Sequence, residues 1–299
     1  MDILAQMTAL FNTVALSDGE AVPALGLGTW RMGESSATRD AEIANLRSAI
    51  ALGYRLIDTA EMYGEGGAES VVGQALAQAL RAGDVQRDDM RVVSKVYPHN
   101  ASRRGTVAAC DRSRQRLGLD CIDLYLLHWR GAHPLAETVD AMASLVQAGK
   151  IRSWGVSNLD LDDMRELDAI TSRPGADTGR CATNQVYYSL TERGPEFGLL
   201  PWMRERAMPL MAYSPIDQGS LAADDTLARI GQARGLTAAQ VALAWVVSQP
   251  GVVAIPKASS TRHLQDNLAA EGVRLSEPEL QLIEKRFPAP KKKTRLSMI

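Results

Sequence analysis

The chain has 299 residues, of which 45% are hydrophobic and 23% are charged, and its formal net charge is −2 at pH 7. This composition is typical of a soluble globular protein and excludes a disordered chain. A nearly balanced charge provides no long-range attraction for nucleic acid or for an anionic membrane surface, so we expect neither as a partner. The length is large for an ordinary domain but typical of one α/β barrel.

The cysteines and the uncharged segments indicate a cellular location. Cys110, Cys121 and Cys181 are few and have no CxxC spacing, which favours a reducing compartment over a disulfide framework. The first seven residues contain no positive segment of the kind that begins a secretory signal. The longest uncharged stretch, 235–256, is interrupted by glutamine and proline, so it indicates a buried helix and a strand rather than a membrane span. We therefore expect a cytoplasmic protein.

Eight short runs rich in β-branched residues or leucine alternate with segments of helical apolar spacing. The predicted strands are centred on Leu27, Ile57, Val93, Leu124, Trp154, Gln185, Met211 and Val253. Several runs are apolar without alternation, as expected for parallel strands that are covered by helices. Eight such units, mostly about 30 residues apart, are the number that closes a (β/α)8 barrel.

Signals for the ends of helices and for a hairpin support this organisation. The clearest helical segments are 40–51, 68–80 and 134–148. Thr237-x-x-Gln240 and Ser276-x-x-Glu279 have the pattern of capping boxes, while Gly149 and Gly235 stand where helices are expected to end. Segment 13–23 has Asp18-Gly19 between two short apolar runs, which predicts a β-hairpin at the bottom of the barrel.

Ionisable and polar residues stand at the C-terminal ends of the predicted strands. In chain order they are Asp58, Lys95, His128, Ser157-Asn158, Asn184-Gln185, Tyr213-Ser214 and Pro256-Lys257, with Tyr63 five residues after Asp58. In a barrel these ends form the face that carries the catalytic groups. Each residue alone also has a structural explanation, such as a loop cap or a solvated lysine. Their shared position on neighbouring strands favours an active site.

Several familiar signatures of other active sites are missing from the sequence. The glycines at 26–28 and 64–67 do not form the dinucleotide fingerprint that follows the first strand of a doubly wound fold. A phosphate-binding loop of the type GxxxxGK[ST] is also absent. The four histidines have no recognisable metal-ligand spacing, so we expect no metal site.

Motifs in a fixed order resemble those of the aldo-keto reductases over nearly the whole chain, with an ending similar to that of bacterial methylglyoxal and aldehyde reductases. They are Gly26-Leu27-Gly28-Thr29-Trp30, Gly53-Tyr54-Arg55-Leu56-Ile57-Asp58-Thr59-Ala60-x-x-Tyr63, Lys95, His128, Gly155-Val156-Ser157-Asn158, Asn184-Gln185, Ala212-Tyr213-Ser214-Pro215 and Ile255-Pro256-Lys257. The resemblance implies a single (β/α)8 barrel domain, residues 1–299, with an N-terminal hairpin. It also implies reduction of aldehydes or ketones by hydride transfer from NADPH, with NADH the less favoured cofactor.

The resemblance makes Tyr63 the general acid of a tetrad with Asp58, Lys95 and His128. A phenol titrates near 10, and an adjacent ammonium favours its deprotonation, so we expect Lys95 to lower the pKa of Tyr63. Asp58 would pair with Lys95 and hold it in place. His128 would donate a hydrogen bond to the substrate carbonyl while negative charge develops on its oxygen.

The resemblance also implies where the cofactor binds. The implied contacts are Gly28, Thr29 and Trp30 from the first strand, Ser157, Asn158 and Gln185 at the carboxamide, Tyr213 stacked on the nicotinamide, Ser214, Ile216, Gly219 and Leu221 at the pyrophosphate, Lys257, Ser259, Ser260 and Arg262 at the 2′-phosphate, and Asn267 at the adenine. Arg262 stands one position before the family's usual basic residue, where this chain has His263. A structural alternative is a basic loop in which Ser260 or Thr261 caps a helix.

Substrate identity rests on fewer residues. Trp30, Met62, Tyr97, Trp129 and the C-terminal tail are the candidate walls of an aromatic pocket. The segment after Phe287 is too short for the long loop that encloses steroids in some members of the family. The resemblance of this ending to that of bacterial reductases implies small aldehydes such as methylglyoxal. One alternative function is a non-catalytic nicotinamide-nucleotide sensor or partner subunit on the same barrel. Another is an aldolase that forms a Schiff base on Lys95. The oligomeric state is left open by the sequence.

Overall fold

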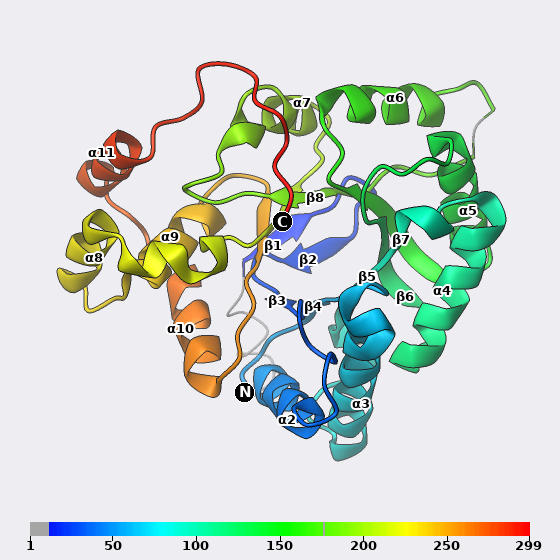
Figure 1. Ribbon diagram of the computed structural model, residues 1–299, viewed down its shortest axis with the longest axis horizontal. Helices are drawn as coiled ribbons and strands as arrows, with labels where there is room; N and C mark the ends of the chain where they lie inside the picture. The colour runs from blue at the N-terminus through cyan, green and yellow to red at the C-terminus, as the bar shows by residue number, and fades with distance from the viewer. Residues whose placement is uncertain (1–11, 176) are drawn as a thin grey trace, which may run out of the picture.

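Eight parallel strands form the central sheet of the protein (Figure 1), whose computed structural model describes residues 12–175 and 177–299. The strands are β3 Leu27–Gly28, β4 Leu56–Asp58, β5 Arg91–Val96, β6 Ile122–Leu127, β7 Ile151–Ser157, β8 Asn184–Tyr187, β9 Leu210–Tyr213 and β10 Val252–Ile255. Each strand pairs with the next along the chain. Bridges from Leu25 to Ala254 and from Gly28 to Lys257 join the first strand to the last, so the sheet closes into the predicted barrel.

Helices surround the barrel on its outside, as Figure 1 shows. They are α2 Arg39–Ala51, α3 Gly67–Ala82, α4 Arg103–Leu117, α5 Leu135–Gln147, α6 Leu161–Thr171, α7 Leu199–Glu205, α8 Asp225–Gln232, α9 Ala238–Val247, α10 Thr261–Glu271 and α11 Glu277–Arg286. The capping box that begins α9 is present, because Thr237 Oγ1 accepts from the backbone of Gln240 at 3.2 Å and Gln240 Oε1 accepts from Thr237 N at 2.8 Å. Gly149 and Gly235 follow α5 and α8 in left-handed conformations, as predicted for helix ends.

Burial on both faces explains why these strands lack alternation. All six residues of β6 are buried. One apolar cluster fills the barrel and includes Leu56, Val93 and Met211, whereas a second cluster lies between the sheet and the helices. A parallel strand between two apolar layers favours side chains such as these at every position.

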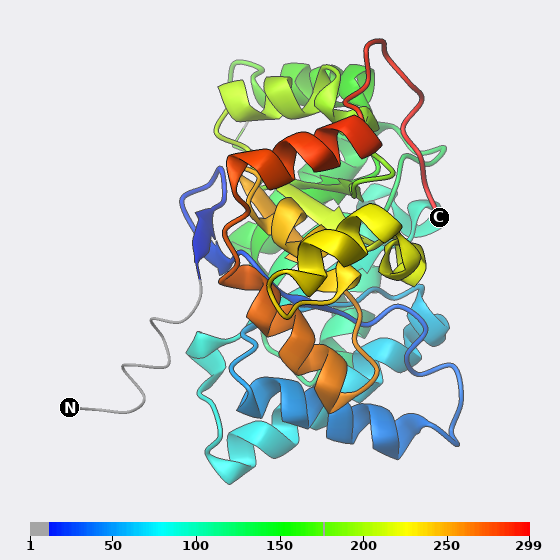
Figure 2. The same cartoon turned by 90° about the vertical axis from the view of Figure 1, so that its left-hand side faces the viewer.

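The hairpin before the first barrel strand closes the bottom of the barrel, as predicted. Strands β1 Thr13–Ala15 and β2 Ala21–Pro23 pair in antiparallel fashion, with Gly19 in the turn at φ +97°. Leu16 and Val22 belong to the apolar cluster that fills the barrel. Figure 2 shows the hairpin and the C-terminal end of the chain at opposite ends of the barrel. The segment 1–7, for which the sequence analysis expects no secretory signal, lies outside the described residues.

One expected strand boundary is wrong. Asn184 and Gln185 begin β8 rather than end it, because that strand continues to Tyr187. They still lie near the catalytic face, since they pair with Val156 and Ser157 at the C-terminal end of β7. The stagger of neighbouring strands around a barrel produces this offset.

Two further structural expectations concern helices and metal ligands. No helix in the described part of the chain is both long and apolar enough to cross a membrane. Among the same residues, no group of three or more histidine, cysteine, aspartate or glutamate side chains is arranged to hold a metal ion.

Candidate active site

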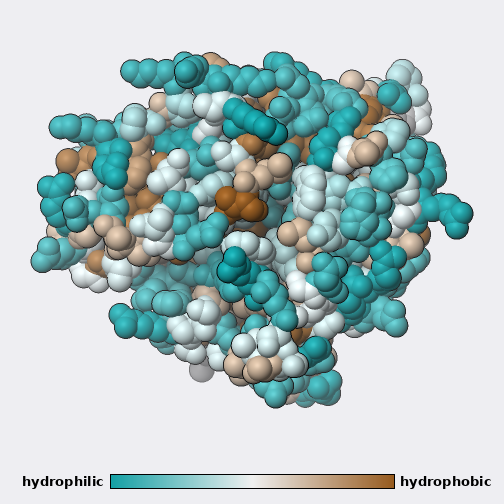
Figure 3. Space-filling model, viewed as in Figure 1, coloured by the Kyte–Doolittle hydropathy of each residue, from teal (hydrophilic) through white to brown (hydrophobic). Residues whose placement is uncertain are grey.

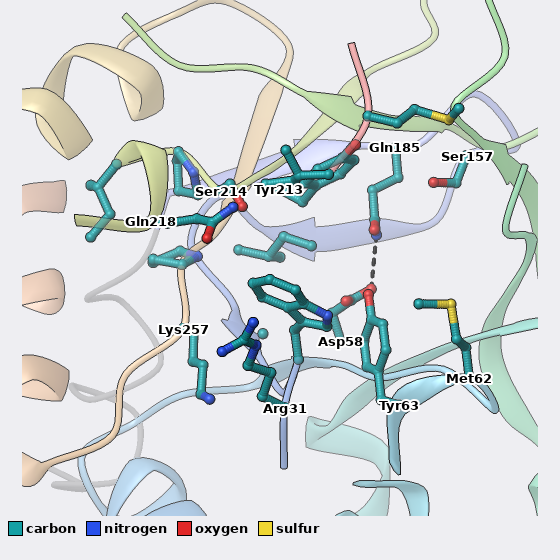
Figure 4. A pocket seen from close by; sticks show the side chains of 18 of the residues that line it. Arg31, Asp58, Met62, Tyr63, Ser157, Gln185, Tyr213, Ser214, Gln218 and Lys257 are labelled. Carbon is teal, nitrogen blue, oxygen red and sulfur yellow. Dashed lines mark hydrogen bonds between the residues drawn. The ribbon is translucent and has the colours of Figure 1, made fainter. Parts of the chain in front are cut away.

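A cavity of about 620 Å³ opens at the C-terminal ends of the barrel strands (Figure 4). The predicted residues that line it are Gly28, Trp30, Asp58, Met62, Tyr63, His128, Trp129, Ser157, Asn158, Gln185, Tyr213, Ser214, Ile216, Gly219, Lys257 and Ser259. Figure 3 shows an apolar patch at the centre of this largely hydrophilic face, where Figure 1 places the C-terminal end of the chain. Residues from seven of the eight barrel strands, or from the segments that follow them, therefore meet in one place.

A buried ion pair lies beneath the cavity and connects to its floor. Lys95 has no exposed surface, and its Nζ donates to Asp58 Oδ2 at 2.8 Å and to the carbonyl oxygen of Thr59 at 2.8 Å. The same ammonium lies 3.4 Å from the hydroxyl of Tyr63, whose side chain faces the cavity. Strands β4 and β5 are direct neighbours, which brings Asp58 and Lys95 together. The expected pairing of Asp58 with Lys95 is therefore present.

Burial is the main influence on the protonation states of Tyr63 and Lys95. It raises the pKa of Tyr63 well above its ordinary value, and the negative charge of Asp58 raises it further. The expectation that the adjacent ammonium favours deprotonation of Tyr63 concerns one contribution only, and the net shift is upward because desolvation of the phenolate and repulsion by Asp58 dominate. Burial lowers the pKa of Lys95, although its pairing with Asp58 opposes that effect. Tyr63 is thus a neutral phenol that carries its proton.

His128 lies beside Tyr63 at the end of β6. The two rings meet edge to face, with centroids 5.7 Å apart. Burial lowers the pKa of His128 well below its ordinary value, and the positive charge of Lys95 lowers it further. The imidazole is therefore neutral at pH 7 and carries a single N–H. Its Nδ1 atom is buried and has no hydrogen-bond partner among the described residues.

Side-chain amides connect this polar group to the opposite wall of the cavity. Gln185 Nε2 donates to Asp58 Oδ1 at 2.8 Å, as Figure 4 shows. Asn158 Nδ2 donates to the carbonyl oxygen of His128 at 3.1 Å, and its Oδ1 accepts from the hydroxyl of Tyr213 at 2.9 Å. Asn158 has a left-handed φ of 56°, a conformation that asparagine adopts more readily than most residues other than glycine.

Positive and hydroxyl groups gather at the end of the cavity remote from Tyr63. Lys257 and Ser259 lie there, and Figure 4 shows Lys257 and Arg31 across the cavity from Met62. Lys257 is exposed as a residue, yet partial burial of its ammonium lowers its pKa. The opposing charges of Glu42 and Glu34 raise that pKa by a smaller amount.

The predicted residues of α10 have different surroundings. The hydroxyl of Ser260 accepts from the backbone N–H of His263 at 3.3 Å, so the structural alternative for this serine, a helix cap, is present. The side chain of Arg262 is 84% exposed and lies 3.8 Å from Asp266 one turn further along the helix. Asn267 is buried beneath the helix. Arg262 and Asn267, like Ser260, lie outside the cavity lining in the described part of the chain.

Four other predicted residues also lie beside the cavity rather than on its surface. Thr29 is buried, and its hydroxyl donates to the backbone oxygen of Asp58 at 3.0 Å. Leu221 is buried in the apolar core. Tyr97 lies behind Trp129, with ring centroids 5.5 Å apart, and Lys95 lies beneath the floor.

Sequence reasoning missed several residues that line the cavity. They are Arg31, Gln218 and His263, while Pro215, Ile255 and Pro256 stand in the sequence motifs without an assigned role. Arg31 and Gln218 have left-handed φ angles of 63° and 52°, which no local sequence pattern announces. His263 was noted only as a departure from the family pattern. Met298 and Ile299, from the C-terminal tail that the sequence offers as a candidate pocket wall, also line the cavity.

Comparison with known proteins connects this geometry to a family. The aldo/keto reductase family model matches residues 24–286. Methylglyoxal reductase YeaE from Escherichia coli is 48% identical over 291 residues, which are 96% of this chain and 98% of that protein. Glyoxal reductase from Bacillus subtilis is 32% identical over 281 residues, 93% of each chain.

A solved structure shares both the fold and much of the sequence. The crystal structure of an aldo-keto reductase from Klebsiella pneumoniae in complex with NADPH superposes with a TM-score of 0.89 at 48% identity. The match covers 97% of this chain and 99% of that one. With a family model that spans most of the chain and relatives that align over nearly their full length, this protein belongs to the aldo/keto reductase family of oxidoreductases.

Proposed function

We propose that this protein reduces aldehydes and ketones to alcohols with NADPH as the hydride donor and Tyr63 as the proton donor. The observation that carries the proposal is the buried chain Asp58–Lys95–Tyr63, which ends in a neutral phenol on the floor of the cavity beside a neutral His128. A carbonyl oxygen placed over that floor has one proton donor and one hydrogen-bond donor within reach.

Each polar group of this chain has a separate task in the proposed reaction. Tyr63 transfers its proton to the carbonyl oxygen as negative charge develops there. Lys95 stabilises the phenolate that results, since the phenolate is costly in so buried a position without a cation. Asp58 fixes the ammonium, and His128 orients the carbonyl through its single N–H.

The rest of the cavity fits a nicotinamide dinucleotide phosphate. Bound NADPH supplies the hydride, which no side chain can provide. Tyr213 offers a ring face supported from behind by Tyr187, with centroids 5.7 Å apart and planes within 16°. Ser157, Asn158 and Gln185 offer hydrogen-bonding groups for the carboxamide. Lys257 and Ser259 offer a cation and a hydroxyl for the 2′-phosphate. The Klebsiella relative's complex with NADPH supports this assignment.

A small aldehyde is the proposed substrate. Trp30, Met62 and Trp129 give the substrate end of the cavity apolar walls. The Escherichia coli relative is named a methylglyoxal reductase and the Bacillus subtilis relative a glyoxal reductase, which supports dicarbonyl aldehydes as the first compounds to test. A cytoplasmic location, the absence of nucleic-acid partners and the single-domain organisation stay predictions.

The two alternative functions lack such support. A nucleotide sensor has no need of the Asp58–Lys95–Tyr63 chain, which is complete here. An aldolase needs a lysine amine that substrate can reach, whereas Lys95 has no exposed surface and is ion-paired. The chemistry of the tetrad therefore favours reduction.

A spectrophotometric screen tests the proposed function. Oxidation of NADPH and NADH is followed with a panel of aldehydes and ketones that includes methylglyoxal and glyoxal. We expect NADPH-dependent turnover with small aldehydes. Binding of NADPH without turnover of any carbonyl would support the sensor, and trapping of substrate on Lys95 by borohydride without any cofactor would support the aldolase.

A further inference from the structure

Glu61 is a buried carboxylate that lies close to the tetrad but outside it. It stands two residues before Tyr63 on the segment that follows β4, and it is 7% exposed. Its backbone N–H donates to the carbonyl oxygen of Lys95 at 3.3 Å, so it is fixed to the neighbouring strand. A buried carboxylate is costly unless hydrogen bonds satisfy it, so its partners indicate what it does.

The partners of Glu61 come from the next two elements of the barrel. Its Oε1 accepts from the backbone N–H of Tyr97 at 2.7 Å and from Nδ2 of Asn100 at 3.0 Å. Its Oε2 lies 3.5 Å from a guanidinium nitrogen of Arg112 on α4. One carboxylate therefore connects the segment that carries Tyr63 to the segment after β5, which includes the short 3₁₀ helix η4 Pro98–Asn100.

The segment after β5 supports a wall of the cavity. The ring of Tyr97 meets the ring of Trp129 edge to face, with centroids 5.5 Å apart and planes at 74°. Trp129 lines the cavity and contacts the ring of His128 at 4.8 Å between centroids. The position of Trp129 thus depends on Tyr97, and the position of Tyr97 depends on the carboxylate of Glu61.

We propose that Glu61 is a positioning residue that holds the aromatic wall of the substrate end of the cavity through Tyr97 and Trp129. The proposal rests on the proposed function for the nature of the substrate. Loss of the carboxylate leaves the N–H of Tyr97 and the side-chain amide of Asn100 without their partner, which frees the segment after β5 to move. The tetrad contacts of Lys95 with Asp58 and Tyr63 do not pass through Glu61. Substrate binding should therefore suffer while the chemical step and cofactor binding do not.

Three variants test the kinetic consequence. In Glu61→Ala we expect the KM for methylglyoxal to rise about fivefold or more, with kcat and the Kd for NADPH within about twofold of wild type. Glu61→Gln should keep the KM within about twofold, because its amide oxygen still accepts from Tyr97. Glu65→Ala is the matched control: Glu65 is exposed on the same segment, and its side chain makes no hydrogen bond or ion pair among the residues that the structure describes. It should behave as wild type.

A second measurement does not depend on activity. Acrylamide quenching of tryptophan fluorescence is measured for each protein and for the same protein that also carries Trp129→Phe. The difference between the two gives the quenching of Trp129. We expect Trp129 to be more accessible in Glu61→Ala than in wild type, Glu61→Gln or Glu65→Ala. If the wild type reduces no carbonyl, the proposed function fails, and the quenching alone decides whether Glu61 holds the wall.

Specific results would overturn the proposal. These are an unchanged KM with unchanged quenching in Glu61→Ala, an equal rise of KM in Glu65→Ala, or a loss of kcat and NADPH affinity that accompanies the rise in KM. If Glu61→Ala does not fold, Tyr97→Leu replaces it, because that variant removes the ring that supports Trp129 and keeps the carboxylate. We then expect the same rise in KM and in quenching, and wild-type values of both would contradict the proposal.

Discussion

The two ends of the cavity differ in how their charges are held. At the tetrad end, Lys95 is fully buried and donates to Asp58 and to a backbone oxygen within 2.8 Å. At the opposite end, which we propose holds the 2′-phosphate and call the phosphate end, Lys257 is exposed, and Arg262, outside the cavity lining, is 84% exposed with a carboxylate 3.8 Å away. Buried charges in fixed hydrogen bonds are preorganised for chemistry, whereas exposed cations are screened by water and adapt to a ligand. Substitutions at the tetrad end should therefore abolish catalysis. Substitutions at the phosphate end should change the affinity for the cofactor.

The largest effect is expected from Tyr63→Phe. The variant removes the proton donor and keeps the ring, so kcat for carbonyl reduction should fall by about 10²–10⁴-fold, the contribution that general acids commonly make. The Kd for NADPH, measured by quenching of tryptophan fluorescence, should stay at the wild-type value because the phosphate end is untouched. Turnover close to that of wild type would remove Tyr63 from the mechanism.

Lys95→Met should have the next largest effect. Without the ammonium the phenolate of Tyr63 loses its stabilising charge, so kcat should fall by about 10²-fold. Because activity in the wild type requires the charged lysine, it should be lost as pH rises through the pKa of Lys95, which burial lowers. The variant should lack that loss at high pH. An unchanged pH profile would mean that the ammonium has no part in the reaction.

A measurement of stability distinguishes the expected loss of activity in Lys95→Met from a loss of folded protein. Lys95→Met leaves Asp58 buried without its cation, and removal of one partner of a buried ion pair commonly costs about 3–5 kcal/mol. Thermal unfolding of the variant, followed by circular dichroism with and without NADPH, shows whether the kinetics were measured on folded protein.

Lys257→Met tests the phosphate end. A charge-assisted hydrogen bond to a phosphate is worth about 1.5–3 kcal/mol, so the Kd for NADPH should rise by about tenfold or more. The Kd for NADH should change little, since NADH has no 2′-phosphate. Parallel titrations of both cofactors measure the difference. Equal increases in the Kd values for NADPH and NADH would mean that Lys257 contacts a part that both cofactors share.

Arg262→Ala should have the smallest effect. The sequence pattern assigns this arginine to the 2′-phosphate, but its side chain points to solvent near Asp266. We expect the Kd for NADPH to change by less than about twofold, as for other exposed charges. A tenfold loss specific to NADPH would show that Arg262 turns to the phosphate when the cofactor binds, as the sequence pattern implies.

The contrast between buried and exposed parts of the molecule also explains how much of the structure could be predicted from the sequence. Each of the eight predicted strand centres falls on a barrel strand, because buried parallel strands have a clear apolar signature. Asp58, Lys95 and His128 stand at or next to strand ends, so the closure of the barrel determines where they meet. The upward shift in the pKa of Tyr63 was not predicted, since the extent of burial cannot be read from a motif.

Residues on irregular segments could not be placed in the same way. Gln218 reaches the cavity through a left-handed backbone, and the path of the C-terminal tail decides which of its residues, Met298 and Ile299, line the cavity. Consecutive residues on a helix point about 100° apart, so the phase of α10 decides whether Arg262 or His263 faces the cavity. That phase depends on where Ser260 begins the helix, which a sequence gives only to within a residue or two.

The pH dependence of kcat/KM of the wild-type protein, measured with a neutral aldehyde and saturating NADPH, tests the central claim most directly. That claim is that burial keeps both Tyr63 and His128 neutral. The pKa of Tyr63 is raised, so its proton is lost only far above pH 7, and the pKa of His128 is lowered, so it gains a charge only well below its ordinary value of about 6.5. We predict a rate that is flat between about pH 6 and 8. A rate that rises as pH falls through about 6.5 would show that a charged imidazole is the acid, and it would contradict the account.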